Sequence, residues 1–388
     1  MPQHDFDQFI SRRGSGSLKW DRYRQDDLLP VWVADMDFLP PPAVIEALHE
    51  RVDHGVFGYG WALDADNAIV ADYWQRRYGW SVEPSWVQWC TGLGFALHLV
   101  AQTIAQPGDS VLTLTPIYPP FLNNPKRAGF TVIDVPLTIA DRRYIIDFDA
   151  LEAAGRPDTR MFFLCHPHNP VGRCYTEAEL RQLADFCLRH DLFVCADEVH
   201  ADLLLEPDCR HIPFASLGPE IAARTITLHA PSKTYNLPGL GCAFLVIPDA
   251  GLRQAFAQAR LGYGVDVPAL GFAACRAALQ HGEAWLTDLL DYLRANRDHA
   301  RDRLAAEAPA IGQFSHEATY LSWLDCRELG IDDPYRHFLQ AGVALSNGVD
   351  FAAPGFLRLN LGCPRALLDQ ALDRMIATLQ GGPPPTTQ

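Results

Sequence analysis

Lys233 has the side chain in this sequence that is best suited to covalent chemistry. It lies in the segment 230–240 and is one of only three lysines among 32 lysine and arginine residues. Arginine stays protonated, whereas a partly desolvated lysine can lose its proton and attack an aldehyde to form an imine. Asn236, Pro238 and Gly239 predict a turn directly after it. The alternative is a surface lysine in a loop.

Two polar side chains follow apolar runs that predict buried parallel strands. Asp197 follows the run 192–196, and Asn169 follows the run 161–165. The carboxyl ends of such strands line the ligand-binding crevice of an open α/β sheet. A carboxylate there can keep a pyridine nitrogen protonated, and an amide can bond a phenolic oxygen. Helix capping by Asp197 and a simple Asn-Pro turn are the alternatives.

A third segment could bind phosphate. Gly92 and Leu93 lie between a predicted strand at 86–90 and a predicted helix from about residue 95. Backbone N–H groups at the start of a helix are suited to a phosphate. The Gly-x-Gly pattern alone is weak evidence for a phosphate site, but here it lies between a strand and a helix, as such a site requires. Ser232 adds a hydroxyl beside Lys233.

Arg358 lies in an alternating strand pattern at 356–362. A guanidinium fork is well suited to a substrate carboxylate, although an arginine in such a strand is more often a surface ion-pair residue. Together, the amine, the carboxylate, the amide and the phosphate turn predict pyridoxal 5′-phosphate as the cofactor.

With these segments in this order, the chain resembles the fold-type I aminotransferase superfamily of pyridoxal phosphate enzymes. Within it, the chain is most similar to the MalY/PatB group of cystathionine β-lyases and C–S lyases. The features typical of this group are spread along nearly the whole chain: Leu18–Asp21, Trp32–Phe38, Phe57–Tyr59, Asp197–Asp202 and Asn360–Pro364. The stretch Trp32–Phe38 and the Asp-Glu-x-His-x-Asp pattern are the more specific features.

The resemblance implies a role for each candidate residue. Lys233 is the expected catalytic residue and also holds the cofactor. The other expected cofactor contacts are Gly92, Leu93, Tyr118, Asn169, Asp197, His200 and Ser232, with Tyr59 contributed by a partner subunit of a homodimer. Arg358 and Ala34 are the expected substrate contacts. Tyr118 would stack on the cofactor ring, or it is a plain core aromatic residue.

Three positions depart from the usual aminotransferase pattern. His200 replaces the Tyr that usually follows the Asp by three residues, and Gly241 replaces an Arg that usually contacts the phosphate. At both positions the chain resembles the C–S lyase group. Ala230 stands where a phosphate-binding Ser is common, so Tyr59 of a partner is the candidate replacement contact.

The resemblance implies β-elimination from an S-substituted cysteine such as cystathionine, which yields a thiol, pyruvate and ammonia. An aminotransferase that uses the same cofactor is the first alternative. The second alternative is a lyase that also binds a transcription regulator, for which the sequence carries no specific feature.

These residues need a framework that brings distant segments together. Alternating strand and helix patterns predict a doubly wound, mostly parallel α/β sheet of aminotransferase fold type I, with a smaller α+β C-terminal subdomain. The predicted divisions are an arm and part of the small domain (1–45), a large cofactor-binding domain (46–275), a small C-terminal domain (276–380) and a frayed tail (381–388). Arg142 and Arg143 are expected in a solvated loop.

Composition narrows the function classes. The formal net charge is −15 and no cluster of basic residues occurs, which argues against nucleic-acid binding. The ten cysteines form no C-x-x-C pair, and His166 and His168 have no third ligand at metal spacing, so no metal site is expected. No signal peptide or membrane span is predicted. We therefore expect a cytoplasmic enzyme with a small-molecule substrate.

Overall fold

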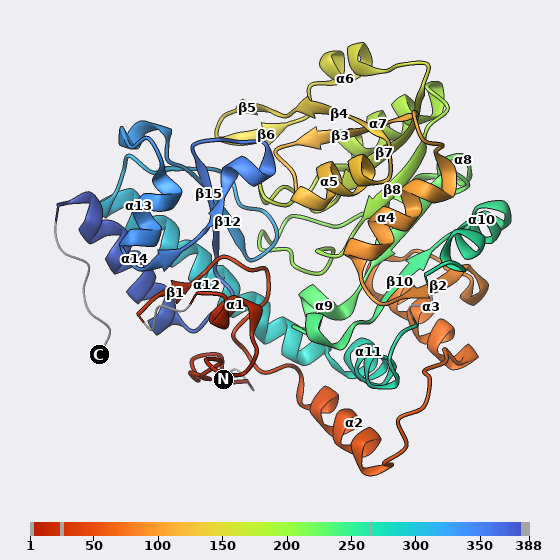
Figure 1. The fold of residues 1–388 in the computed structure, drawn as a ribbon, viewed down its shortest axis with the longest axis horizontal. Helices are drawn as coiled ribbons and strands as arrows, with labels where there is room; N and C mark the ends of the chain where they lie inside the picture. The colour runs from red at the N-terminus through yellow and green to blue at the C-terminus, as the bar shows by residue number, and fades with distance from the viewer. Residues whose placement is uncertain (1–3, 24–26, 264–265, 382–388) are drawn as a thin grey trace.

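A seven-stranded sheet forms the centre of the computed structural model, which describes residues 4–23, 27–263 and 266–381 (Figure 1). The strand order is β2-β10-β9-β8-β7-β3-β4, and β10 runs antiparallel to both of its neighbours. The bounds are β2 (Val87–Cys90), β3 (Ser110–Thr115), β4 (Thr131–Pro136), β7 (Thr159–Cys165), β8 (Phe193–Asp197), β9 (Thr225–His229) and β10 (Ala243–Val246). The prediction of a mostly parallel α/β sheet is confirmed.

Helices cover both faces of this sheet, because successive side chains of a strand point to opposite faces. In β7, Met161 and Phe163 pack in one core cluster, whereas Phe162 and Leu164 pack in another. The first cluster includes side chains of α4 (Leu93–Ile104), α5 (Pro119–Arg127) and α10 (Ala250–Arg260). The second includes side chains of α6 (Phe148–Ala154), α7 (Glu177–Arg189) and α8 (Pro219–Ala222). Burial on both faces explains why these strands are continuous apolar runs.

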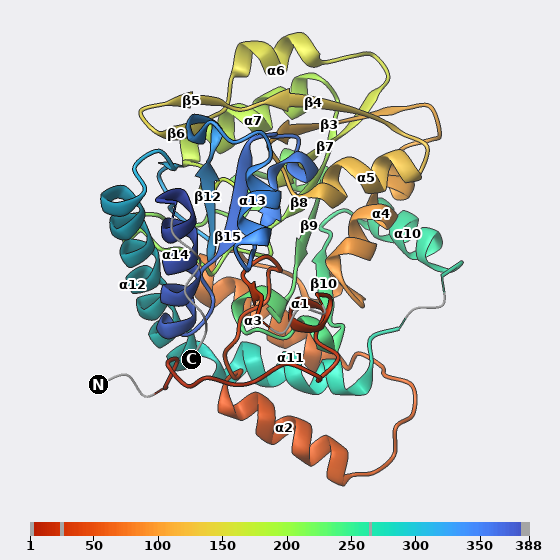
Figure 2. The ribbon, with the colours of Figure 1, turned by 60° about the vertical axis from the view of Figure 1, so that its left-hand side comes forward.

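A smaller antiparallel sheet is built from the C-terminal part of the chain. Its order is β11-β12-β15-β14, with bounds β11 (Gly312–Gln313), β12 (Leu321–Asp325), β14 (Ser346–Asn347) and β15 (Phe356–Asn360). The helices of this part are α12 (Glu283–Glu307), α13 (Pro334–Gln340) and α14 (Arg365–Leu379). Figure 2 shows that α12 and α14 lie side by side.

The N-terminal arm joins this C-terminal part. Its strand β1 (Leu29–Pro30) pairs in parallel with β13 (Val343–Ala344), after the short helix α1 (Leu18–Asp21). The helices α2 (Pro42–Asp53) and α3 (Asp64–Tyr78) follow, and α2 packs along α11 (Ala269–His281) (Figure 2). The domain limits stay a prediction, and nearly all of the expected frayed tail lies outside the described residues.

One predicted loop is a hairpin instead. The strand β5 (Thr138–Ala140) pairs with β6 (Arg143–Ile145), and the Arg143 Nε donates to Glu317 Oε1 at 2.6 Å. The expectation of a solvated loop is confirmed for Arg142, which is exposed in the turn of this hairpin, but it was wrong for Arg143, which lies in β6 and bonds a residue 174 positions away in the sequence. No helix in the described ranges is both long and apolar enough to cross a membrane.

Candidate active site

The ends of four parallel strands position four of the predicted residues. Tyr118 follows β3, Asn169 follows β7, Asp197 is the last residue of β8, and Lys233 follows β9 in the short helix α9 (Pro231–Thr234). Parallel neighbours carry their carboxyl ends to one edge of the sheet. The four side chains therefore come from the same edge, although they span more than a hundred residues of sequence.

Lys233 lies at this edge as a half-buried side chain. The Nζ donates to the carbonyl oxygen of Ala34 at 2.6 Å. Burial lowers the pKa of Lys233 to about 8, and the positive charge of Arg358 acts in the same direction. An amine of this pKa is partly neutral near pH 8, as a nucleophile or a base requires.

The stretch that carries Ala34 has no helix or strand of its own between Val31 and Phe38, so side chains from elsewhere hold it. Asn236 accepts a hydrogen bond from Met36 N and donates to the carbonyls of Met36 and Phe38 at 2.8–2.9 Å. Asn360 Nδ2 donates to the carbonyls of Val33 and Asp35. The Ala34 carbonyl is thereby fixed opposite Lys233.

A buried ion-pair cluster anchors the same stretch. Asp37 accepts from Lys19 Nζ at 2.7 Å, from Trp20 Nε1 at 2.8 Å and from Arg12 Nη1 at 2.7 Å. Arg12 also pairs with Asp35 at 2.7 Å. Lys19 is fully buried and already paired. This lysine therefore has a structural partner and is not free for covalent chemistry.

Asp197 is a buried carboxyl group that has no ion pair with any residue the structure describes. It is 5% exposed, and among the residues that the structure describes it accepts one hydrogen bond, from Val199 N at 3.1 Å. Burial raises the pKa of Asp197 to about 7, against the opposing effects of that hydrogen bond and of the Lys233 charge. A ligand N–H with positive charge would satisfy the free oxygen and favour the ionised form.

Arg358 projects from β15 toward the same place. Its Nη1 donates to Asn169 Oδ1 at 2.9 Å, and its Nη2 donates to Trp32 O and Ser346 Oγ at 3.1 Å. The Nε is buried and has no hydrogen-bond partner in the described part of the chain. Burial lowers the pKa of Arg358 to about 10. This guanidinium therefore has donor capacity left for an anionic ligand.

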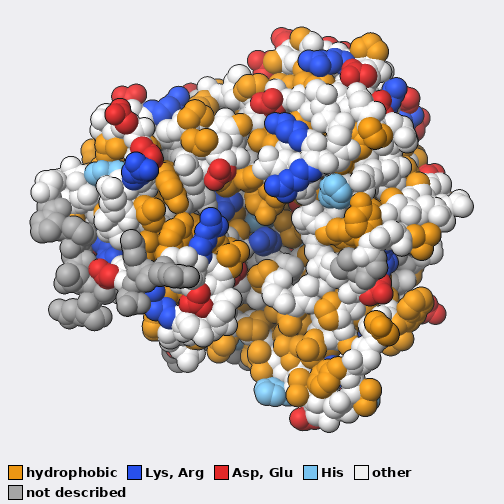
Figure 3. All heavy atoms as spheres, in the orientation of Figure 1, with side chains coloured by type: hydrophobic (Ala, Val, Ile, Leu, Met, Phe, Trp, Pro, Cys, Tyr) orange, Lys and Arg blue, Asp and Glu red, His pale blue; other side chains and the backbone are white. Residues whose placement is uncertain are grey.

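One cavity of about 370 Å³ collects Lys233, Ala34, Tyr118 and Arg358. The space-filling view shows a hollow with Lys and Arg side chains, in the region where Figure 1 places β15 and α9 (Figure 3). The sequence predicted all four residues, and they come from the arm, from two strand ends of the large sheet and from the small sheet. The cavity therefore lies where the two sheets and the arm meet.

The predicted phosphate turn has the open backbone that a ligand needs. Gly92 is the N-cap of α4, and no described side chain caps this end of the helix. A Cβ added at Gly92 or Gly94 would meet no atom within 4 Å. Gly241 lies beside this turn, since its added Cβ would be 3.5 Å from Thr91 O, and its φ of +59° favours glycine. Ser232 lies in the first turn of α9.

His200 is a further buried group without a described partner. It is 2% exposed, and its Nδ1 has no hydrogen bond among the described residues. Burial and the positive charges of Lys233 and Arg358 lower the pKa of His200. A neutral imidazole can accept a hydrogen bond from a ligand.

The structure does not bring Tyr59 to the cavity of its own chain. Tyr59 is fully exposed in the irregular segment 54–63, and it lines a separate cavity with Gly60 and residues 266–270. A Cβ at Gly60 would lie 2.2 Å from Val267 O, which shows how closely this segment packs on residues 267–269. Tyr59 therefore lines a different cavity from Lys233.

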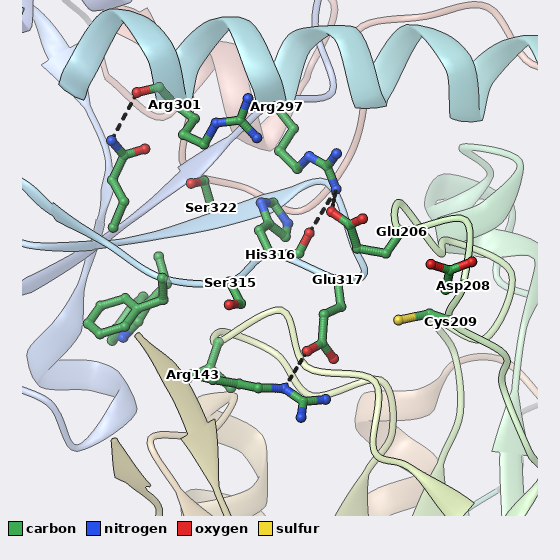
Figure 4. Close-up of a pocket in the computed structure, with 14 residues that line it drawn as sticks. Arg143, Glu206, Asp208, Cys209, Arg297, Arg301, Ser315, His316, Glu317 and Ser322 are labelled. Carbon is green, nitrogen blue, oxygen red and sulfur yellow. Dashed lines mark hydrogen bonds and ion pairs between the residues drawn. The ribbon is translucent and has the colours of Figure 1, made fainter. Parts of the chain in front are cut away.

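A second cavity, of about 470 Å³, is less suited to catalysis. It lies beside Arg143, Glu206, Arg297 and Glu317 (Figure 4). Its arginines are paired with carboxylates, since Arg143 bonds Glu317 and Arg297 bonds Glu206, each at 2.6 Å. Within residues 4–23, 27–263 and 266–381, no cluster of three His, Cys, Asp or Glu side chains suits a metal ion.

Comparison with known families agrees with this geometry. A family model for aminotransferase class I and II matches residues 27–375. The chain belongs to this family.

Several family members are similar over nearly their full length. Cystathionine beta-lyase PatB of Bacillus subtilis (strain 168) is 38% identical over 387 residues, which cover 97% of this chain and 100% of PatB. The crystal structure of OvoB matches with a TM-score of 0.95 and 41% identity, covering 98% and 100% of the two chains. Cystalysin from Treponema denticola, which contains a pyridoxal 5′-phosphate cofactor, matches with a TM-score of 0.93 and 31% identity, covering 97% and 99%. The predicted family and fold are confirmed.

Sequence reasoning missed several residues that shape this family member's site. Asp202 accepts hydrogen bonds from Tyr73, Tyr78 and Thr234 at 2.5–2.9 Å and pairs with Arg77. Asp202, Asn236 and Asn360 were noted only as parts of motifs or turns. A buried Asp, or an Asn within a strand, could have suggested such a role, because buried polar groups must be satisfied.

Proposed function

We propose that this chain is a pyridoxal phosphate-dependent C–S β-lyase, which cleaves cystathionine or a related S-substituted L-cysteine to a thiol, pyruvate and ammonia. One observation carries the proposal: Lys233, with its lowered pKa, shares a cavity with the anion-binding Arg358. The full-length similarity to a protein named cystathionine beta-lyase supports the same reaction.

The described residues fit the cofactor in charge and in hydrogen bonding. Lys233 is positioned to hold it covalently, and the free oxygen of Asp197 can pair with its ring nitrogen. The remaining proposed contacts are Tyr118 on the ring face, Asn169 and His200 beside the phenolic oxygen, and Gly92, Leu93 and Ser232 at the phosphate. When bound, the cofactor withdraws electrons from the substrate Cα and so makes its proton removable.

The residues of the chain have separate roles in binding the substrate and in moving its proton. Arg358 binds the substrate carboxylate through its remaining donors, and this contact fixes the orientation of Cα. The neutral Lys233 amine accepts the Cα proton. The Cβ–S bond breaks with its electron pair leaving on sulfur, and the thiolate takes up a proton. The three-carbon fragment adds water and is released as pyruvate and ammonia.

Amine transfer is the competing reaction of the family. His200 and Gly241 at two positions, and the C–S lyase similarity, favour elimination. The test is to give purified protein cystathionine with and without an added 2-oxo acid, and to measure pyruvate and free thiol. We expect equal amounts of both products without the 2-oxo acid. Rapid amine exchange with 2-oxoglutarate and no pyruvate from cystathionine would contradict the proposal.

The proposed enzyme is a homodimer in which Tyr59 reaches the phosphate of the partner's cofactor. Support comes from an exposed apolar segment that holds Val56, Phe57, Tyr59, Trp61 and Leu63. Patches of this kind mark interaction surfaces, and an obligate interface buries more than about 2,000 Å². A fully active monomer at nanomolar concentration in sedimentation and activity measurements would rule this out.

The proposed location is the cytoplasm. All ten cysteines are unpaired; nine are buried and Cys209 is partly buried. Reduced buried thiols are typical of cytoplasmic proteins.

A further inference from the structure

The outer part of the Lys233 cavity carries two charges that the proposed reaction does not use. Lys233 and Arg358 are its inner cations, and they are assigned to the cofactor and to the substrate carboxylate. Arg22 and Asp350 also line this cavity. Both side chains are exposed, so they lie where the cavity opens to solvent.

Trp32 connects Arg22 to the inner site. The Arg22 guanidinium lies 4.9 Å from the centre of the Trp32 ring. The Trp32 carbonyl accepts from Arg358 Nη2 at 3.1 Å. Arg22 and the Arg358 guanidinium, which is assigned to the substrate carboxylate, therefore both contact Trp32. Stacking on the Trp32 ring limits the conformations of the Arg22 side chain.

Phe351 connects Asp350 to the same guanidinium from the other side. The Arg358 guanidinium lies 4.8 Å from the centre of the Phe351 ring. Asp350 precedes Phe351 in the turn of 3-10 helix Gly348–Phe351. Arg22 thus contacts one neighbour of Arg358, and Asp350 adjoins another in the sequence.

Neither charge is neutralised by the part of the protein that the structure describes. Among residues 4–23, 27–263 and 266–381, Arg22 and Asp350 have no ion pair within 4.0 Å, either with each other or with another side chain. The second cavity differs, because its arginines are all paired with carboxylates. Two unpaired opposite charges in one cavity suit a ligand that itself carries both charges.

We infer that Arg22 and Asp350 determine specificity for the leaving group. They favour S-substituted cysteines whose thiol part bears its own carboxylate and ammonium groups. The carboxylate pairs with Arg22 and the ammonium with Asp350, while Arg358 holds the carboxylate beside the reacting Cα. This assignment rests on the proposed lyase function, because it concerns the group on sulfur.

The pair also acts against other substrates. A leaving group with only a carboxylate meets the like charge of Asp350, and one with only an ammonium meets that of Arg22. A neutral alkyl group gains nothing from either residue. The opposed charges therefore discriminate by repulsion as well as attraction.

Four substrates separate these effects: cystathionine, S-ethyl-L-cysteine, S-(2-carboxyethyl)-L-cysteine and S-(2-aminoethyl)-L-cysteine. Pyruvate release is measured for wild type, Arg22→Gln and Asp350→Asn. Arg22→Gln should lower kcat/KM for cystathionine and for the carboxyethyl substrate by roughly two- to fivefold, as expected for solvent-exposed charge contacts. Asp350→Asn should do the same for cystathionine and the aminoethyl substrate. Both variants should process S-ethyl-L-cysteine like wild type.

Controls keep the inference distinguishable from the lyase proposal. Arg127→Gln and Asp185→Asn remove exposed charges that do not line the cavity, and they should leave all four substrates unchanged. Arg22→Lys keeps the charge and should retain most of the preference for cystathionine. Equal losses of kcat/KM on all four substrates, or no loss on cystathionine, in the Arg22→Gln and Asp350→Asn variants would overturn the specificity assignment. Pyruvate release by wild type would still support the lyase proposal in that case. No pyruvate from any substrate with wild type would overturn both.

Discussion

Replacing Asp202 with Asn should cost the protein a large share of its stability. The Asp202 carboxylate is buried and accepts from Tyr73 OH at 2.5 Å, Tyr78 OH at 2.6 Å and Thr234 Oγ1 at 2.9 Å, while Arg77 pairs with it at 3.1 Å. An Asn amide removes the charge and replaces one acceptor with a donor. At least one donor of the cluster then lacks an acceptor.

The expected cost follows from these contacts. Removing one member of a buried ion pair costs about 3–5 kcal/mol. Arg77 is 25% exposed and can be partly solvated in the variant, so the lower end applies. We expect the free energy of unfolding to fall by about 3 kcal/mol, which is more than a hundredfold in the unfolding equilibrium. Turnover should also fall, because Thr234 adjoins Lys233.

Urea unfolding followed by circular dichroism measures this loss. The matched control is Asp72→Asn on α3, the helix that carries the Arg77 partner of Asp202; Asp72 pairs with Arg76 at 2.6 Å but is 61% exposed. That pair is solvated, so its loss should change stability by less than about 0.5 kcal/mol. Equal effects of the two variants would refute the role given to the Asp202 cluster.

The pH dependence provides a second readout of the same cluster. Burial opposes ionisation of Asp202, but the Arg77 charge and the hydrogen bonds of Tyr73 and Tyr78 hold its pKa below the ordinary 3.8. A carboxylate with a lowered folded pKa contributes fully above the unfolded pKa, and the contribution is lost as pH falls through the folded value. Wild type should therefore lose stability below about pH 4, and Asp202→Asn should lose less over that range.

Three further outcomes are expected. Lys233→Ala should abolish pyruvate release with an unchanged circular dichroism spectrum, whereas Lys126→Ala should remain active; turnover by Lys233→Ala would refute the assignment. Arg358→Ala should lower kcat/KM for every amino-acid substrate at least tenfold, because a charge-assisted contact contributes about 1.5–3 kcal/mol; a change confined to one leaving group would contradict its role at the carboxylate. In cofactor-free protein, acylation of Lys233, followed by mass spectrometry, should be half-maximal near pH 8, since burial disfavours the charged amine; a midpoint near its ordinary 10.5 would exclude that effect.

The fold and the residues of the inner cavity were largely predictable because short sequence patterns indicate the strands, the turns and the side chains that follow them. Asp197 and Asn169 follow buried strands whose length and apolar composition are readable, and parallel pairing places their ends at one edge. Lys233 was identified by the scarcity of lysine and by its flanking turn. These signals lie within a few residues of the functional side chain.

The missed features depend on contacts between distant segments. Asn236 clamps a stretch that lies about 200 residues earlier, and Asp202 pairs with Arg77 across 125 residues. Arg143 was expected in solvent for the same reason, since Glu317 is distant in sequence. Periodicity describes which face of an element is buried, but it does not specify which polar partner meets a given side chain.

The most direct test is to determine which lysine holds the cofactor. Purified protein with bound pyridoxal 5′-phosphate is reduced with borohydride, digested and mapped by mass spectrometry. We predict the cofactor on the peptide that contains Lys233, because Lys19 is fully buried in an ion pair with Asp37 and Lys126 is exposed on α5. A cofactor adduct on Lys19 or Lys126, with Lys233 unmodified, would contradict this account of the site.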